Sequence, residues 1–267
     1  NGIHIDYIAG TSMGGVVGAL SAYGYSGVEI EEHVRKIDWG DLFIDGVNRD
    51  FMSYSDKTAV SKYFLNLGFD RHGFKMQRGL VSGQKVENLF NSLVGPCSNS
   101  DDFDNLPTPF RAVSADILTG EQYVLKSGSL AEAMRCTMSI PGIFTPVEKN
   151  GRFLVDGMVV NNLPVDVARE MGADIIIAVN LSSYQTTKDE LRTPVGTASQ
   201  MLSLYISDIV QKQLVNADIV LQPALNGYTS MSYFKMEEIV KAGEDITNRM
   251  LPQIIELVGE ENINAFP

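Results

Sequence analysis

The sequence predicts an α/β protein: a three-layer sandwich in which helices cover both faces of a mostly parallel central sheet. Short runs of strand-forming residues alternate along the chain with longer stretches whose apolar residues recur at helical spacing. Residues 175–179 are apolar without interruption, which is typical of a strand buried on both faces of a parallel sheet. No internal repeat or linker divides the 267 residues, so we expect one domain over residues 1–267.

The first elements surround a glycine-rich turn. Residues 3–9 form a strand-like run that ends at Gly10. A helix follows, and its apolar residues recur at helical spacing: Met13, Val16, Val17, Leu20 and Tyr23. Ser26 and Glu29 have the spacing of a capping box and predict the start of a second helix. Residues 38–79 are irregular and rich in aromatic residues, which we interpret as a lid or insertion.

The middle of the chain returns to regular elements. Residues 82–94 have a helical pattern, and residues 110–117 and 122–125 form two strand-like runs. Ser129 and Glu132 make a second capping box, which predicts a helix that ends before Pro141. Two further runs, 146–149 and 152–155, flank Asn150-Gly151, the dipeptide most typical of a tight hairpin.

The last third alternates helices and strands. Pro164 and Gly172 have the positions expected for the start and end of a helix. After the strand near 175–179, a long helix is predicted by an apolar stripe: Ala198, Met201, Leu202, Tyr205, Ile206, Ile209, Val210 and Leu214. Residues 219–221 form a short strand-like run, and residues 236–258 form a final amphipathic helix.

Composition excludes several classes of function. The net charge of −12 disfavours binding to nucleic acid. No apolar run reaches the length of about 18 residues that a membrane-spanning helix needs. Two cysteines, Cys97 and Cys136, make neither a disulfide framework nor a zinc motif. The chain starts at Asn1 without a signal-peptide pattern and reads as an excerpt, so its compartment, cytoplasm or cell envelope, stays open.

The main chemical motif is Gly10-Thr11-Ser12-Met13-Gly14, a G-x-S-x-G between a predicted strand and a predicted helix. That context is typical of a nucleophile elbow, in which a strained turn presents a serine at a helix N-terminus. Gly10 and Gly14 leave room for the turn. The N–H of Met13 and the helix dipole would stabilise an oxyanion at the carbonyl under attack by Ser12. Phosphate-loop and dinucleotide motifs do not fit, since no lysine and no G-x-G follow.

The base that activates Ser12 is predicted to be a carboxylate. The three histidines, His4, His33 and His72, do not follow a late strand, where a Ser-Asp-His hydrolase places its base. Asp156 closes the predicted strand 152–155 and precedes a glycine. A carboxylate at the carboxyl end of a strand is where an open α/β sheet presents catalytic groups. To act as a base it needs burial or a tight hydrogen bond with Ser12, because an ordinary aspartate is weakly basic.

These residues together resemble the patatin-like phospholipase family. The resemblance rests on three segments, Gly10–Gly14, Arg135–Glu148 and Val155–Asp166, and covers about the first two thirds of the chain. It implies a three-layer fold and a metal-independent Ser/Asp dyad that hydrolyses acyl esters of lipids, with no cofactor. Ser12 matches the family's nucleophile and Asp156 the aspartate of its Asp-Gly motif, although Met158 departs from the small residue usual two positions later.

A second departure concerns the family's glycine-rich oxyanion loop, which lies one crossover helix upstream of the elbow. Residues 1–9 contain no such stretch. We therefore expect that this loop and its strand belong to a segment outside this chain. The alternative is a degenerate oxyanion hole, which would cost about 10²- to 10³-fold in turnover.

Substrate contacts are predicted in residues 63–77. Phe64, Phe69, Phe74 and Met76 alternate there with basic residues, a mixture suited to a lipid interface or an acyl-pocket cover. A packed loop with a basic rim is the alternative. Residues 101–104 are acidic but lack the calcium-loop spacing, so we interpret them as a solvated loop.

The sequence thus predicts a lipid acyl hydrolase of the phospholipase A or esterase type, with a phospholipid or another acyl-ester lipid as substrate and contact with a membrane surface. Two alternatives remain: a lipid transacylase, and a non-catalytic lipid-binding or scaffolding module. Oligomeric state and headgroup preference stay open.

Overall fold

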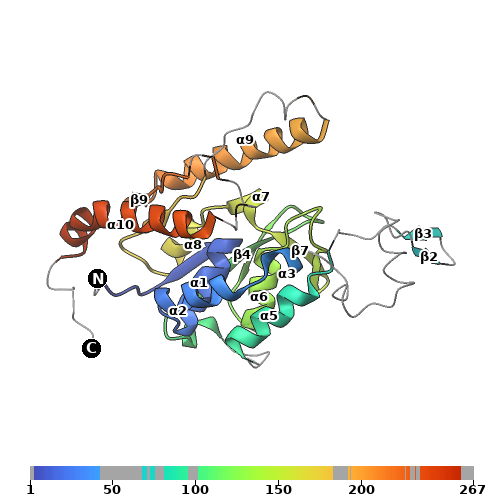
Figure 1. Ribbon diagram of the computed structural model, residues 1–267, viewed down its shortest axis with the longest axis horizontal. Coiled ribbons are helices and arrows are strands. Elements are labelled where there is room, and N and C mark those ends of the chain that lie inside the picture. The colour runs from blue at the N-terminus through green and yellow to red at the C-terminus, as the bar shows by residue number, and fades with distance from the viewer. Residues whose placement is uncertain are drawn as a thin grey trace.

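The computed structural model describes residues 3–42, 68–70, 73–75, 81–95, 102–182, 192, 194–225, 227–228, 232 and 235–259. It is an α/β fold in which helices pack around a mixed central sheet (Figure 1). The strands are β1 Ile8–Thr11, β2 Gly68–Asp70, β3 Gly73–Lys75, β4 Phe110–Asp116, β5 Gln122–Leu125, β6 Val147–Lys149, β7 Arg152–Asp156, β8 Ile177–Val179 and β9 Ile219–Leu221. The helices are α1 Met13–Tyr23, α2 Gly27–Lys36, α3 Trp39–Leu42, α5 Gln84–Val94, α6 Leu130–Thr137, α7 Met158–Asn161, α8 Val165–Glu170, α9 Pro194–Leu214 and α10 Met236–Val258, with a 3₁₀ turn at Phe103–Asn105.

Among the described residues, the central sheet contains five strands: β4 pairs with β1, β5 and β7, and β7 pairs in turn with β6. Only β1 and β4 run parallel; the β4–β5, β4–β7 and β6–β7 pairs are antiparallel. The expectation of a mostly parallel sheet was therefore wrong. Two of the antiparallel pairs have a local cause, because the short turns at Thr119-Gly120 and Asn150-Gly151 can join only antiparallel neighbours, whereas parallel strands need a long crossover. The antiparallel β4–β7 pair instead joins residues far apart in the chain.

Strands β1 and β7 share one edge of β4. Residues 112–115 of β4 pair with β5, so β1 (opposite 110–113) and β7 (opposite 114–116) must both lie on the other edge. Thr11, the last residue of β1, is paired with Val113, and Asp156, the last residue of β7, is paired with Ser114. The carboxyl ends of the two strands therefore meet end to end.

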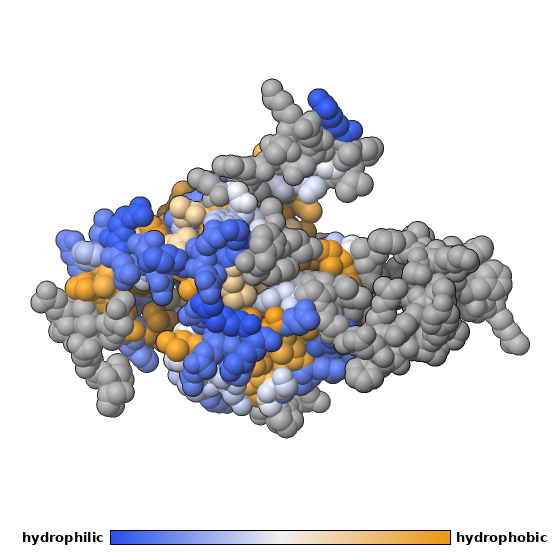
Figure 2. Space-filling view, in the orientation of Figure 1, coloured by the Kyte–Doolittle hydropathy of each residue, from blue (hydrophilic) through white to orange (hydrophobic). Residues whose placement is uncertain are grey.

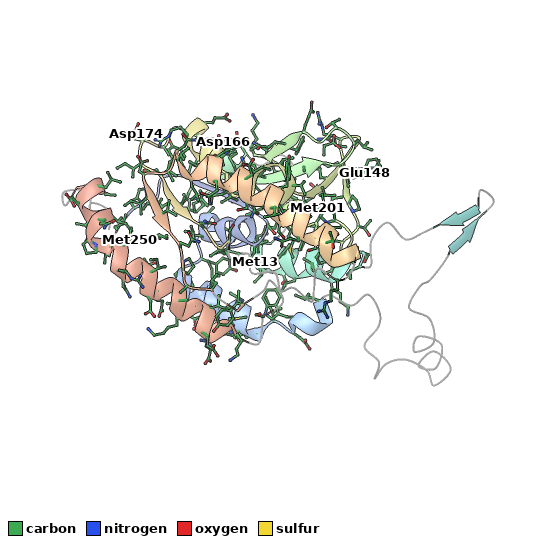
Figure 3. All side chains as sticks on the ribbon, turned by 90° about the horizontal axis from the view of Figure 1, so that it is seen from above. Met13, Glu148, Asp166, Asp174, Met201 and Met250 are labelled. Atoms are coloured by element: carbon green, nitrogen blue, oxygen red, sulfur yellow. The ribbon has the colours of Figure 1, made fainter. Side chains whose placement is uncertain are left out.

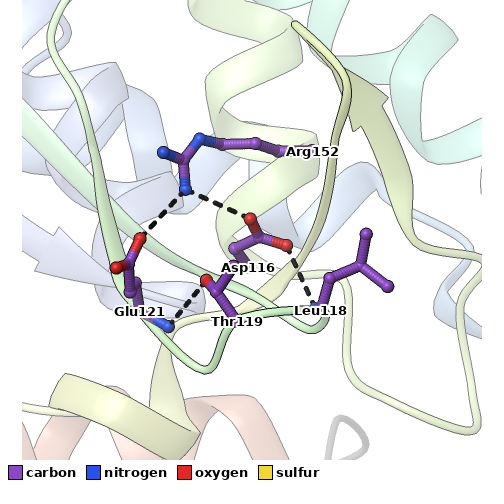
Figure 4. Close-up of polar contacts among 5 residues, drawn as sticks. All are labelled: Asp116, Leu118, Thr119, Glu121 and Arg152. Carbon is purple, nitrogen blue, oxygen red and sulfur yellow. Dashed lines mark hydrogen bonds and ion pairs between the residues drawn. The ribbon is translucent and has the colours of Figure 1, made fainter.

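A polar cluster ties the far end of β7 to β4 (Figure 4). The Arg152 guanidinium donates to Asp116 Oδ2 at 3.1 Å and to Glu121 Oε2 at 3.3 Å. The other oxygen of Asp116 accepts the N–H of Leu118 at 3.1 Å, and the Thr119 hydroxyl accepts the N–H of Glu121. Because Asp116 is almost fully buried, these bonds help to hold the register that places Asp156 beside β1.

Helices α1 and α6 pack on one side of β4, and α7 packs against β4 beneath α9 (Figure 1). Both predicted N-terminal caps form: Ser26 and Glu29 make the full capping box, and the Ser129 hydroxyl accepts the N–H of Glu132. Close approach of α1 to the sheet requires glycine, since a Cβ on Gly18 would lie 2.8 Å from Ile8 Cγ2. The main core lies among α1, α5, α6 and the sheet.

The C-terminal third forms a separate parallel pair, β8 with β9. The prediction of a strand buried on both faces was wrong here, because Ile175 and Val179 are 38% and 54% exposed while the residues between them are largely buried. The stripe on α9 is likewise only half buried. Ile206 and Val210 are buried in the core that forms around α8 and β8, whereas Met201 is 68% exposed (Figure 3). None of the described helices is long and apolar enough to cross a lipid bilayer.

Candidate active site

The turn between β1 and α1 is strained as the sequence predicts. Ser12 has φ 56° and ψ −131°, a conformation that a non-glycine residue adopts at a cost of about 1–3 kcal/mol. Gly10 is required beneath the turn, because an added Cβ would lie 2.5 Å from the carbonyl oxygen of Gly14. Gly14 itself is different, since a Cβ there would meet nothing within 4 Å.

Thr137, at the end of α6, holds this turn in place. Its hydroxyl accepts the N–H of Ser12 at 2.9 Å and donates to the carbonyl of Val113 on β4 at 2.5 Å. The side chain is completely buried. One hydroxyl thus ties the strained serine to the centre of the sheet.

Removing this hydroxyl gives a first testable prediction. We expect Thr137→Val to lower the free energy of unfolding by about 2 kcal/mol, because two buried backbone groups lose a partner. Thr137→Ser keeps the hydroxyl and is the matched control. Urea unfolding of the two variants measures the difference; equal stabilities would contradict the bracing role.

The Ser12 hydroxyl faces a carboxylate. It donates to Asp156 Oδ2 at 2.5 Å, the length of a charge-assisted O–H···O⁻ bond. The other oxygen of Asp156 accepts the N–H of Met158 at 2.9 Å. Each carboxylate oxygen of Asp156 therefore accepts one hydrogen bond, from the Ser12 hydroxyl or from the Met158 N–H. The Asp156 side chain is fully buried.

Burial changes the acidity of this carboxyl group. Desolvation raises the pKa of Asp156 to about 6, while the hydrogen bonds from Ser12 and from Met158 act in the opposite direction. No cation of the described chain contributes to the shift. At pH 7 and above the group is mostly ionised, and it is a stronger base than an exposed aspartate.

The N-terminus of α1 lies at the same point. The N–H of Val16 donates to the carbonyl of Ser12 as the first bond of the helix, so the N–H groups of Met13, Gly14 and Gly15 stand outside the helical ladder. Together with the helix dipole, they make the region next to Ser12 favourable for a negative charge. The N–H of Ser12 itself is engaged by Thr137.

The structure places two histidines in other contacts. His4 lies 3.6 Å from Asp6, and the His33 ring packs edge-on against Tyr25 at 5.3 Å between centroids. His72 lies outside the described residues. Within the described part of the chain, the hydrogen-bond partner of the Ser12 hydroxyl is Asp156 and not a histidine.

The structure describes only two of the four predicted substrate-binding residues. Phe69 and Phe74 pair across the antiparallel ribbon β2–β3, whereas Phe64 and Met76 lie outside the described residues. Most of the predicted insertion 38–79 lies outside them as well.

Other candidate groups of the sequence have structural partners. Asp104 pairs with the Arg111 guanidinium, which lowers the pKa of that carboxyl. No cluster of three metal-ligating side chains occurs among the described residues. Burial raises the pKa of the Cys136 thiol to about 12, so this cysteine is unreactive.

Two further residues shape the site, and the sequence pattern marks only one of them. Thr137 lies in the segment Arg135–Glu148, one of the three segments that resemble the patatin-like phospholipase family. The resemblance gave no role to this threonine. Gly157 fits at the junction of β1, β4 and β7, where a Cβ would lie 2.5 Å from the carbonyl oxygen of Val113. The Asp-Gly dipeptide was the available signal for Gly157; nothing local marks Thr137.

The chain is similar to several known proteins. Patatin-like phospholipase domain-containing protein 7 of Rattus norvegicus is 28% identical over 269 residues, which cover 91% of this chain and 18% of that protein. An uncharacterized NTE family protein of Mycobacterium bovis is 29% identical over 184 residues, 69% of this chain and 43% of that protein. The crystal structure of VipD from Legionella pneumophila covers 92% of this chain and 61% of its own, with 13% identity and a TM-score of 0.42.

The family model for patatin-like phospholipase matches residues 1–169. This range is more than half of the chain and includes β1, the strained turn, Thr137 and β7. It therefore includes both Ser12 and Asp156. The chain belongs to the patatin-like phospholipase family.

Proposed function

We propose that this chain is a lipid acyl hydrolase of the phospholipase A or esterase type that works through a Ser12/Asp156 dyad without a metal ion. The observation that carries the proposal is the 2.5 Å contact between Ser12 Oγ and Asp156 Oδ2 at a helix N-terminus. Family membership supports the lipid ester as the class of substrate. We also propose that residues 1–267 fold as one three-layer domain.

The geometry supports a two-step reaction. Asp156 takes the proton of Ser12 as its oxygen attacks the ester carbonyl, and the leaving alcohol departs with that proton. The oxyanion forms next to the N–H of Met13, outside the helical ladder of α1. Water then gives a proton to Asp156 and attacks the acyl-enzyme, which releases the fatty acid and restores Ser12.

Covalent labelling tests this proposal. We expect a fluorophosphonate to modify Ser12, with a rate that rises with pH through a midpoint near 6 and is constant above it. The sign follows from the raised pKa of Asp156: below about pH 6 the carboxyl is protonated and cannot accept the serine proton. Intact mass and peptide mapping measure the labelled fraction at each pH.

Two variants complete the experiment. Ser12→Ala should abolish labelling, and Ser26→Ala, at the exposed start of α2, should leave it unchanged. If the wild-type protein binds lipid vesicles but is not labelled at any pH, the chain is a lipid-binding module instead. If it is labelled and forms acyl-enzyme but transfers the acyl group to an added alcohol faster than to water, it is a transacylase.

A further inference from the structure

Residues of α1, α2, α3 and α5 and the residue that follows α6 line an apolar groove beside the candidate site. Its lining comes from one face each of α1, α2, α3 and α5 and from the end of α6: Met13, Val16, Val17, Leu20, His33, Val34, Ile37, Trp39, Leu42, Val86, Leu89, Phe90, Leu93 and Met138. These helices lie together on one side of the sheet (Figure 1), and Figure 2 shows apolar surface on this face around α1 and α5.

The groove has a buried floor and an accessible rim. Leu20, Val86 and Phe90 are almost fully buried, whereas Met13 and Val17 on the exposed face of α1 are 36% and 41% exposed. The surface that it presents is apolar throughout. A headgroup or a peptide backbone placed there would lose its hydrogen bonds to water without replacement.

The groove is also narrow. Its cavity volume is about 30 Å³, within about 530 Å³ of empty space that includes the part open to solvent. The α1 side of the groove extends from Met13 to Leu20, a rise of about 10 Å along the helix axis. A long, thin and wholly apolar group fits these dimensions better than a ring or a helix.

One end of the groove is covalently next to the nucleophile. Met13 follows Ser12 in the chain, and Met138 follows Thr137, whose hydroxyl holds the Ser12 N–H. The groove therefore begins at Met13, the residue next to the Ser12 Oγ that would attack the ester carbonyl carbon. A second cavity lies away from Ser12, since it is lined by residues of the β8–β9 region and α10.

We propose that this groove binds the acyl chain of the ester attacked by Ser12, so that the helix face Met13–Val17–Leu20 and α5 select substrates by chain length. The inference rests on the proposed function, and it places the hydrocarbon chain of the substrate in the groove between α1 and α5. The groove selects for unbranched aliphatic chains long enough to reach Leu20. The headgroup lies outside it, on the solvent side of Ser12.

Chain-length selectivity tests the assignment by catalysis. With soluble p-nitrophenyl esters below their micellar concentrations, each methylene buried in the groove should raise kcat/KM about fourfold. From butyryl to octanoyl ester the increase is roughly 200-fold. Val17→Phe fills the groove from its rim and should lower the octanoyl-to-butyryl ratio by roughly tenfold or more. Val28→Phe makes the same change on the exposed face of α2, outside the groove, and should leave the ratio unaltered.

Trp39 provides a second test that needs no turnover. It is the single tryptophan of the chain and it lines the groove. A fatty acid brominated along its chain should quench Trp39 fluorescence with saturation in the wild-type protein and in the Val28→Phe variant. In Val17→Phe the same quenching should require roughly tenfold more fatty acid or more.

The outcomes separate the two proposals. If esters are cleaved in a Ser12-dependent manner but Val17→Phe and Val28→Phe have the same chain-length ratio, the groove assignment is wrong and the proposed function stands. If no ester is cleaved but Trp39 is quenched as expected, the proposed function fails while the groove still binds hydrocarbon. If Trp39 is not quenched and Val17→Phe changes the association state in sedimentation, the groove is an interface with another copy, and the assignment is overturned.

Discussion

The Asp156→Asn variant is expected to lose ester cleavage by roughly 10³-fold while its fold becomes more stable at pH 8. The loss of activity follows from the removal of the base that faces Ser12 at 2.5 Å, since an amide cannot accept the serine proton. The shape of the side chain is nearly kept, so substrate binding should change little. Steady-state kinetics should show the effect in kcat rather than in KM.

The gain in stability has an electrostatic cause. Burial raises the pKa of Asp156 from 3.8 to about 6, so the folded state binds the carboxyl proton more tightly than the unfolded chain does. A group with a raised pKa stabilises the fold below its unfolded pKa, and that contribution is lost as the pH rises through about 6. At pH 8 the ionised carboxylate therefore costs up to about 3 kcal/mol, which the neutral amide avoids.

The control for this variant removes the same charge from the surface. Asp174 is exposed, and Asp174→Asn should leave both the activity and the free energy of unfolding at pH 8 close to those of the wild-type protein. Urea unfolding of the three proteins at pH 8 and at pH 4 gives the comparison; the advantage of Asp156→Asn should be present at pH 8 and absent at pH 4. A variant that is less stable than wild type at pH 8 would show that Asp156 is held by interactions stronger than its desolvation.

Replacement by alanine should have opposite effects on the free energy of unfolding at the two glycines of the Gly10–Gly14 motif. Gly10→Ala places a methyl group 2.5 Å from the backbone carbonyl oxygen of Gly14 and 2.6 Å from the amide nitrogen of Gly15, neither of which is flexible. Relief requires the helix to move away from the strand, so we expect a loss of about 3 kcal/mol or more in the free energy of unfolding.

Gly14→Ala is the matched comparison. A methyl group there meets nothing within 4 Å, and an alanine within the first turn of α1 is favoured over glycine by up to about 1 kcal/mol. Thermal and urea unfolding distinguish the two variants. A Gly10→Ala protein as stable as Gly14→Ala would mean that α1 does not approach β1 as closely as the structure has it.

Local elements could be predicted from the sequence because their causes are local. The Ser26–Glu29 capping box depends on residues three apart, and the Asn150-Gly151 hairpin on two residues that tolerate positive φ, observed at 52° and 75°. The strained Ser12 turn belongs to the same class, since the glycines and the strand-to-helix change are within a few positions of it. The antiparallel pairing of β7 with β4 was not predictable in this way, because it joins residues far apart in the chain.

The meeting of Ser12 and Asp156 shows the same limit. The argument from the sequence was that an open α/β sheet presents catalytic groups at the carboxyl ends of its strands. In the structure β7 runs antiparallel to β4, and the two residues, 144 positions apart in the chain, meet because β1 and β7 abut end to end on one edge of β4. This contact between strand ends depends on the pairing of both strands with β4, which no local pattern indicates.

By itself the sequence determined the strained serine turn, the helix caps, the hairpin and the chemical types of the two facing groups, since each depends on residues adjacent in the chain. Only the tertiary structure decided the antiparallel course of β7, the bracing of Ser12 by Thr137, the raised pKa of Asp156 and the apolar groove between α1 and α5. Each of these arises from atoms that distant segments bring together, and burial and close contact exist only once those segments have packed.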